Sequence, residues 1–482
     1  MNSLAARASH AGARAWSSGT AMTWVSIAMR ALSVLVVLPL LLTRFSVEET
    51  AIWYLLVTLI GLQSLADLGF APTFIRVLAF AMGGSTQLKD LRVASEQGGT
   101  GEPRWDLVER IWRTMAVVYR RLTAGSVVLF AVLGTFALLR PMSTLADPAA
   151  GWLAWGVVVV TFAVSIQSNA YAAYLQGLDQ IALLRRWETL ASAAAMITSL
   201  LVLVAGGRLL ALVIANQAWV ILNAVRNWWL CRTIEGGRAA KFAAGPSDTE
   251  VIDAVWGSAI RSGLGVAFSR GVILTSGIVY AQVADAKDLA AYLVAFRIMQ
   301  MLMDFSNAPF YSALPLLARL RSEGREEEQV RVAARGMRVS YWAYLAGVVG
   351  VGISAPYAFV YLDSNTPWIS QTLWATMSVA FLVERFGAMH IQLYSTTNHI
   401  IWHIANGVSG TLYLVVSFVL LPFAGVYAFP LGILVGYLSF YSWYAPLHVY
   451  RAFNMDFWSF QRNTVLLPGS LLLAFAAASF LI

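Results

Sequence analysis

The sequence predicts an all-α membrane protein with many spanning helices, built from two similar halves. Of its 482 residues, 59% are hydrophobic and only 12% are charged, whereas soluble proteins carry about 25% charged residues. Its apolar runs reach the roughly 20 residues that a helix needs to cross a bilayer. A short motif in the first half also recurs in the second, 237 residues later. Together these observations predict a polytopic membrane protein with an internal duplication.

Apolar runs bounded by charged residues, proline and glycine predict two sets of six spans and one additional helix. The first set is 20–44, 51–83, 122–140, 150–177, 183–205 and 208–232. The second set is 254–281, 289–318, 339–362, 368–395, 399–423 and 426–450, and a thirteenth apolar run covers 464–482. We therefore expect an N-terminal lobe (1–235), a cytoplasmic linker (236–253), a C-terminal lobe (254–450) and a tail with an additional apolar helix (451–482).

The repeated motif places an aspartate five residues before a proline within an apolar run. Asp67 precedes Pro72 in the first half, and Asp304 precedes Pro309 in the second. Proline removes a backbone donor, so each motif predicts a broken or kinked helix and a candidate hinge. Each carboxylate has two open interpretations, which are acceptance of backbone amides freed by the proline and a proton or cation site.

Lysine and arginine counts predict the orientation of the chain. With a cytoplasmic N-terminus, the inner segments hold 23 basic residues and the outer loops hold only four. Cytoplasmic loops carry the excess of basic residues in membrane proteins. The first apolar run is also too long for a typical signal peptide. We therefore expect a multi-pass protein whose N-terminus is cytoplasmic.

Six arginines inside predicted spans remain after the basic residues counted with the inner segments and outer loops are set aside, and three acids stand against them. The arginines are Arg30, Arg76, Arg261, Arg270, Arg297 and Arg385, and the acids are Asp67, Asp304 and Glu384. Charged side chains within a membrane span usually face a protein-lined cavity. Because arginine cannot lose its proton to escape burial, the unmatched guanidinium groups indicate that an anion visits the interior.

The position of each arginine along its span leaves different alternatives open. Arg30 and Arg270 lie deep in their helices and match between the halves, so they are candidates for a cavity, or else for static salt bridges to the two aspartates. Arg76 and Arg261 lie near the inner face, where interfacial anchoring is the alternative. Arg297 could join an ion network with an aspartate seven residues later.

The sequence also indicates which chemistries are absent. Its basic residues lie in short loops between apolar spans, as membrane topology requires, so nucleic-acid binding is not expected. A single cysteine, Cys231, excludes a disulfide framework, and there is no motif typical of catalysis. His399 and His403 have metal-ligand spacing but no carboxylate or cysteine neighbour, so headgroup binding or packing is preferred over zinc. We expect neither an enzyme nor a cofactor, and Glu384 is a candidate ion-coupling group.

Two segments resemble a known family of transporters. The segment WYLLVTLIGLQSLADLGFAPTFIRVLAFAMGG is similar to the second-helix signature of Wzx-type polysaccharide flippases, which belong to the multidrug/oligosaccharidyl-lipid/polysaccharide (MOP) exporter superfamily. The similarity extends to YLQGLDQIALLRRWE at 174–188, to the arrangement of six plus six helices and to the chain length. The resemblance implies two pseudo-symmetric six-helix bundles around a central cavity that opens alternately to each side.

The resemblance also implies a substrate, a location and partners. It implies that undecaprenyl-pyrophosphate-linked oligosaccharide moves to the outer leaflet of the bacterial inner membrane, for O-antigen, capsule or exopolysaccharide assembly. Membrane lipids and a polysaccharide polymerase are the other expected partners. The cationic cavity residues of the family are similar in placement to Arg30 and Arg270, and Arg261 and Arg297 are further candidates for binding the pyrophosphate.

Two alternative functions stay open. A multidrug/cation antiporter of the same superfamily would need an anionic cavity, whereas the charged residues in the predicted spans are mainly cationic. A membrane glycosyltransferase or O-antigen ligase would need a large outer loop that carries catalytic residues. No predicted outer loop is longer than about a dozen residues, which disfavours that alternative.

Overall fold

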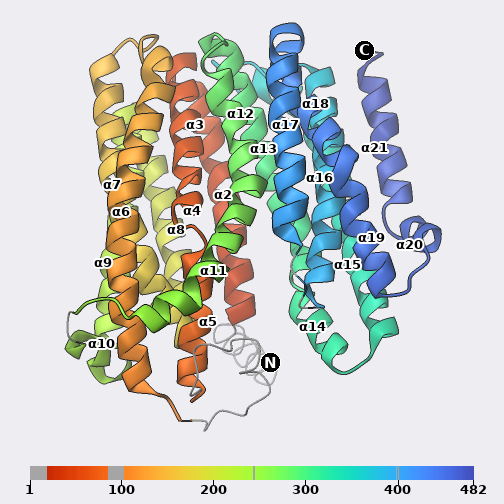
Figure 1. Cartoon of the computed structure of the whole chain (residues 1–482). Coiled ribbons are helices and arrows are strands. Elements are labelled where there is room, and N and C mark those ends of the chain that lie inside the picture. Colours follow the sequence, from red (N-terminus) through yellow and green to blue (C-terminus); the bar gives the residue numbers. More distant parts are fainter. Residues whose placement is uncertain (1–18, 85–101, 243–244, 398, 400, 482) are drawn as a thin grey trace, which may run out of the picture. The chain divides into compact units, whose positions relative to one another are not determined.

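The computed structural model describes residues 19–84, 102–242, 245–397, 399 and 401–481 (Figure 1). The described part is helical and contains no strand. Seven helical stretches within it are long and apolar enough to cross a membrane by length and composition. These stretches are Trp105–Met142, Pro148–Gly177, Ile181–Val204, Leu209–Lys241, Ala286–Arg321, Glu326–Tyr361 and Trp402–Ala452. The predicted all-α membrane fold is confirmed.

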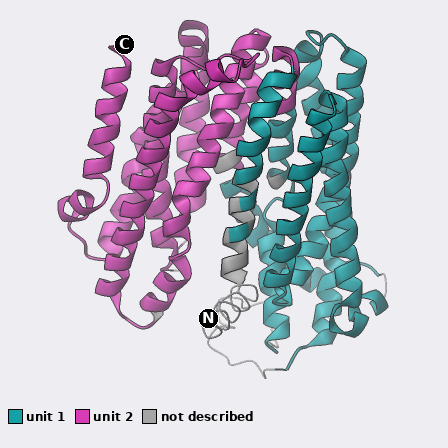
Figure 2. Ribbon diagram, turned by 180° about the vertical axis from the view of Figure 1, so that it is seen from behind, with its two compact units in different colours: residues 1–45, 56–266 teal, residues 46–55, 267–482 magenta. Residues whose placement is uncertain are grey.

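The chain forms two compact units, shown in teal and magenta in Figure 2. Unit 1 comprises residues 1–45 and 56–266, and unit 2 comprises residues 46–55 and 267–482. The lobe boundaries predicted from the sequence, with a linker at 236–253, stay a prediction. The chain passes between the units at 45/46, which lies between α2 and α3, at 55/56 within α3, and at 266/267, where η2 follows α11 directly.

Unit 1 is a helical bundle with one interrupted helix near its N-terminal end. Its helices are α2 (Gly19–Arg44), the second part of α3 (Val47–Gly61), α4 (Gln63–Ala66), α5 (Phe70–Met82), α6 (Trp105–Met142), α7 (Pro148–Gly177), α8 (Ile181–Val204), α9 (Leu209–Thr233), η1 (Ile234–Gly237), α10 (Arg238–Lys241) and α11 (Thr249–Val266). Helix α7 packs against α9, and α2 packs against α8. The rings of Phe130 and Phe162 stack 3.9 Å apart and join α6 to α7.

Unit 2 contains the remaining helices, two of which are short π-helical segments. They are η2 (Ala267–Gly271), α12 (Val272–Tyr280), α13 (Ala286–Tyr311), α14 (Leu314–Ser322), α15 (Glu326–Tyr361), α16 (Gln371–Ser395), α17 (Trp402–Ala424), η3 (Gly425–Tyr427), α18 (Ala428–Gly436), η4 (Tyr437–Tyr441), α19 (Ser442–Ala452), α20 (Phe457–Asn463) and α21 (Leu466–Ser479). A buried cluster that includes Phe310, Met337, Tyr341 and Met389 joins α13, α15 and α16.

Local sequence explains where several helices begin. Asp147 accepts a hydrogen bond from the backbone amide of Ala150 at 3.0 Å, and Pro148 occupies the first turn of α7. Asp285 accepts from the backbone amide of Asp288 at 2.8 Å at the start of α13. These side chains satisfy amides that have no partner within the helix, so they define each helix start.

The additional C-terminal helix predicted within 464–482 is confirmed as α21. It packs against α15 and α16 within unit 2. A side chain at Gly352 would place its Cβ atom 2.7 Å from the ring of Phe475, so glycine is needed for this close approach. The 14 residues of α21 extend about 21 Å at 1.5 Å per residue, which is less than the roughly 30 Å of bilayer hydrocarbon.

Candidate functional site

The helix that follows α3 is interrupted at residues 67–69, three residues before Pro72. Helix α4 ends at Ala66 and α5 begins at Phe70. Between them Leu68 and Gly69 adopt left-handed backbone conformations, with φ values of 47° and 74°. An interruption was expected here from the sequence, and the left-handed turn explains why glycine is present.

The carboxylate of Asp67 accepts hydrogen bonds at this interruption of the helix. Its Oδ2 atom accepts from the backbone amide of Ala71 at 2.8 Å, and its Oδ1 atom accepts from the hydroxyl of Tyr119 at 2.6 Å. The side chain is buried, at 7% exposure. A negative charge beside the first turn of α5 also interacts favourably with the dipole of that helix. This arrangement matches the structural interpretation of Asp67, and the ion-coupling interpretation stays a hypothesis.

Helix α11 packs directly onto the interruption through two glycines. A Cβ atom on Gly69 would lie 2.5 Å from the carbonyl oxygen of Ala259 and 2.6 Å from the backbone nitrogen of Gly263. A Cβ atom on Gly263 would lie 2.5 Å from the carbonyl oxygen of Leu68. Backbone therefore contacts backbone, and this close approach brings the polar residues of α5 and α11 together.

Two arginines meet where α5 and α11 pack together. Arg76 on α5 donates from Nη2 to the hydroxyl of Ser258 on α11 at 2.9 Å. Arg261 lies three residues after Ser258, hence on the same face of α11, and its positive charge acts on Arg76. Both arginines are exposed. We name Arg76, Ser258 and Arg261 the two-arginine cluster.

The two-arginine cluster has an excess of positive charge. Within the described residues, neither Arg76 nor Arg261 forms a salt bridge with an acid. Two like charges held near each other repel, so an anion between them would gain from both. Guanidinium groups also offer paired donors that match phosphate oxygens. The cluster is therefore suited to bind a phosphate or pyrophosphate group.

The other predicted pyrophosphate ligands lie elsewhere or outside the described side chains. Arg30 lies in α2 and Arg270 in η2, but the side chains of both are outside the described residues. Arg297 is half-buried on α13 in unit 2, where its Nη1 atom donates to Gln300 Oε1 at 3.4 Å. It also interacts electrostatically with Tyr54 on α3. Their role in substrate binding stays a prediction.

The second copy of the aspartate–proline motif differs locally from the first. Helix α13 continues without interruption past Asp304 and ends at Tyr311, two residues after Pro309. Asp304 is exposed, whereas Asp67 is buried and hydrogen-bonded. No described residue forms a salt bridge with Asp304, so the ion network considered for Arg297 is not seen as a direct pair. The equivalence of Pro72 and Pro309 as hinges stays a hypothesis.

Glu384 and Arg385 occupy different environments on α16 in unit 2. Glu384 is half-buried, while Arg385 is 3% exposed. The Nη2 atom of Arg385 donates to the carbonyl oxygen of Met303 on α13. Sequence analysis placed Arg385 within a span but could not show that its guanidinium group is enclosed by neighbouring helices.

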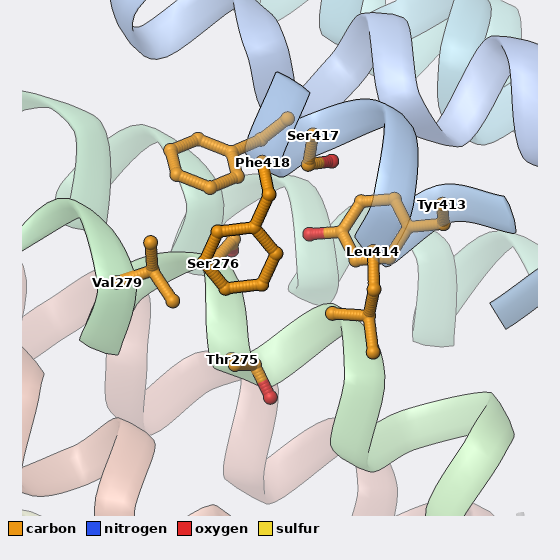
Figure 3. Close-up of a pocket in the computed structure, with 8 residues that line it drawn as sticks. Thr275, Ser276, Val279, Tyr413, Leu414, Ser417 and Phe418 are labelled. Carbon is orange, nitrogen blue, oxygen red and sulfur yellow. The ribbon is translucent and has the colours of Figure 1, made fainter. Parts of the chain in front are cut away.

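Unit 2 also contains a small hollow between α12, α17 and α18. Figure 3 shows its lining residues, which are Thr275, Ser276, Val279, Tyr413, Leu414, Ser417, Phe418 and Phe429. Tyr292 donates its hydroxyl to Ser276 at 2.9 Å. None of the lining residues is charged, so this hollow does not provide a pyrophosphate site.

Several polar residues within the helices of unit 1 join neighbouring helices. Gln63 donates to Ser165 Oγ, and Thr161 donates to Gln217 Oε1 at 2.7 Å. Asn216 donates to Ser199 at 3.1 Å, which joins α9 to α8. Hydrogen bonds between helices satisfy polar groups inside a membrane bundle, so these contacts are explained by packing.

Sequence analysis missed two residues of the site. Tyr119 orients Asp67, and Ser258 joins the two arginines. The spacing of Ser258 and Arg261 on one helix face was a usable signal. The contact between Tyr119 and Asp67 had no such signal, because 52 residues separate them and only the packing of α6 brings them together.

The fold of the chain is similar to the folds of solved MOP-superfamily transporters. It superposes on an inward-facing multidrug resistance MATE family transporter with a TM-score of 0.59 and 13% identity, covering 88% of this chain and 99% of that one. An outward-facing MATE transporter gives a TM-score of 0.60 and 11% identity, covering 91% and 96%. The lipid II flippase MurJ, in an inward closed conformation, gives 0.58 and 10% identity, covering 96% and 98%.

These similarities define the fold and leave the substrate open. The sequence matches no protein-family model and no curated protein. At 10–13% identity, a structural likeness shows the fold alone. The chain therefore has a fold that is also found in a lipid II flippase and in a multidrug resistance transporter.

Proposed function

We propose that this protein moves an undecaprenyl-pyrophosphate-linked oligosaccharide from the inner to the outer leaflet of the bacterial cytoplasmic membrane. The charged head of such a lipid cannot cross about 30 Å of hydrocarbon unaided, whereas its tail can stay in the bilayer. Alternating access, with the N-terminus in the cytoplasm, would carry the head through a polar interior. The product would serve the assembly of a surface polysaccharide.

The observation that carries this proposal is the two-arginine cluster. Arg76 and Arg261 hold two positive charges near each other without a salt bridge to any described acid. A pyrophosphate would supply the missing negative charge. Each charge-assisted hydrogen bond contributes about 1.5–3 kcal/mol, so losing one weakens binding by about ten- to a hundredfold. Arg30, Arg270 and Arg297 are proposed as further ligands during transport.

A multidrug/cation antiporter is the second candidate. Its supporting observation is the exposed carboxylate of Asp304, which could attract a cationic drug. The fold is equally compatible with both functions, because MATE transporters and a lipid II flippase superpose on the chain with similar scores. The charge of the two-arginine cluster favours an anionic substrate.

Reconstitution into vesicles distinguishes the two candidates. A fluorescent lipid-linked oligosaccharide in the vesicle membrane reports flipping through its accessibility to an impermeant quencher, and uptake of a cationic dye reports antiport. We expect flipping that depends on the protein, with no dye transport. Dye transport driven by a proton or sodium gradient, without flipping, would contradict the proposal.

A further inference from the structure

Arg385 presents a buried positive charge within unit 2 that the proposed transport reaction does not use. Its side chain is 3% exposed and lies between α16, α13 and α15. The Nη2 atom donates to the carbonyl oxygen of Met303 and lies 3.3 Å from the sulfur atom of that residue. The guanidinium carbon lies 5.5 Å from the centre of the Tyr344 ring. These contacts fix the group in place but provide no full counter-charge.

Two nitrogen atoms of the same guanidinium group have no hydrogen-bond partner. Both Nε and Nη1 of Arg385 are buried without one, and so is the hydroxyl of Tyr341, a residue of α15 that interacts electrostatically with Arg385. Because arginine keeps its proton, it cannot escape the cost of burial by becoming neutral. All three groups can donate a hydrogen bond, and an acceptor that also carries negative charge would neutralise the buried guanidinium group.

The acids near Arg385 do not fill this role directly. Glu384 and Asp304 both act on Arg385 electrostatically, but no described acid forms a salt bridge with it. Adjacent residues of a helix point about 100° apart, so Glu384 faces a different direction from Arg385. Asp304 is exposed at the surface of α13.

We infer that Arg385 and Tyr341 bind a small monovalent anion of the halide type inside unit 2. The Nε and Nη1 groups of Arg385 and the hydroxyl of Tyr341 would donate to it. This anion would neutralise a fixed charge in the helix bundle and stabilise the contact between α13, α15 and α16. It is a site distinct from the two-arginine cluster, which lies in unit 1.

Halide-dependent stability tests this inference. Thermal unfolding of the purified full chain in detergent is followed over a range of chloride concentrations, with gluconate replacing chloride at constant ionic strength. We expect the Tm to rise and saturate with chloride or bromide. In Tyr341→Phe the half-saturating concentration should increase about tenfold or more, because a donor to the anion is lost.

Tyr174→Phe is the matched control for this substitution. The hydroxyl of Tyr174 is also buried without a hydrogen-bond partner, but it lies in unit 1. Its removal should leave the half-saturating halide concentration unchanged. Arg385→Leu should abolish the halide dependence, and the comparison of the two tyrosine variants decides the question even if that variant does not fold.

Crystals grown in bromide provide a direct test, since anomalous scattering should place a peak beside Arg385.

Three results would overturn the inference. One is a Tm that is equal in chloride and gluconate at every concentration. Another is an equal shift in both tyrosine variants. The third is a halide dependence that appears only in Glu384→Gln, which would show that Glu384 is the counter-charge of Arg385.

Discussion

The hydroxyl of Tyr119 on α6 donates to Asp67 Oδ1 at 2.6 Å, in the turn that precedes α5. Through this bond α6 holds the carboxylate that in turn accepts the backbone amide of Ala71. The geometry of the interruption before α5 depends on this bond. The position of Arg76, which lies on α5, therefore depends on it as well.

Tyr119→Phe should destabilise unit 1 by about 1–3 kcal/mol, because the buried carboxylate of Asp67 loses one of its two donors. Thermal unfolding of the purified protein measures the effect. Tyr174→Phe, which removes a buried hydroxyl that has no hydrogen-bond partner, should change stability much less. Equal losses in the two variants would show that the bond to Asp67 has no special importance.

Gly263→Ala should destabilise the contact between α11 and the interruption. Its Cβ atom would lie 2.5 Å from the backbone oxygen of Leu68, and overpacking of this kind costs about 1–3 kcal/mol. Gly125→Ala is the matched control, because nothing lies within 4 Å of a Cβ atom there. The control should be neutral or slightly stabilising, since alanine favours a helix. A neutral Gly263→Ala variant would contradict the close contact.

Acid should weaken the contact between α6 and the start of α11. Arg110 bonds to Asp248 and Glu250, each at 2.6 Å, and this guanidinium group holds the pKa of Asp248 below its usual value. The stabilisation is therefore present above the unfolded pKa of about 3.9 and is lost as the pH falls through the lower folded pKa. Because the pair is partly exposed, it contributes about 1 kcal/mol or less.

The difference in stability between the wild type and Asp248→Asn, measured from pH 6 downward, checks this prediction. We expect the difference to shrink as Asp248 becomes protonated in the wild type. Asp253→Asn, at an exposed position of α11, is the control. A difference for Asp248→Asn that is constant down to the lowest pH at which the protein stays folded would contradict the role of the carboxylate.

Membrane potential alone should drive transport of the proposed substrate. Outward movement of an anion across an inside-negative membrane gains about 2.3 kcal/mol per charge per 100 mV, so two phosphate charges gain about 4–5 kcal/mol. In a rocking mechanism the arginines move little through the field, so most of this gain persists. Flipping measured in vesicles with an imposed potential, and without proton or sodium gradients, tests this.

Flipping that responds to a proton or sodium gradient but not to potential would overturn that prediction. It would make Glu384 or Asp67 the candidate coupling site. Asp67→Asn then distinguishes a structural role of this residue from an ion-coupling role. The asparagine amide keeps an acceptor oxygen for Tyr119 or Ala71 but cannot titrate. Under our account the variant is less stable but still transports.

Sequence patterns predicted the helical membrane fold and its broken second segment, because hydrophobic runs and the local effects of Gly69 and Pro72 act within a few residues. They did not predict the difference at Asp304, where Ser306 stands in the place of Gly69 and the helix continues to Tyr311. The spacing of aspartate and proline alone is therefore insufficient, and the two copies differ in the glycine that favours a left-handed turn.

The candidate site was only partly predictable for the same reason. The sequence indicated Arg261 as a candidate pyrophosphate ligand because it is charged within an apolar segment. It indicated Arg76 only as another arginine inside a predicted span. Their proximity depends on the glycine contact between Gly69 and Gly263, which joins segments nearly 200 residues apart in the chain. No periodicity within one helix contains that information.

The most direct test of the two-arginine cluster is flipping of a lipid-linked oligosaccharide by reconstituted Arg76→Gln, Arg261→Gln and the double variant. Arg121→Gln is the matched control, because Arg121 is also exposed but lies on α6. We predict at least a tenfold loss of flipping in each single variant, a larger loss in the double variant, partial activity in the corresponding lysine variants and normal activity in the control. Normal flipping by a folded double variant would contradict the account.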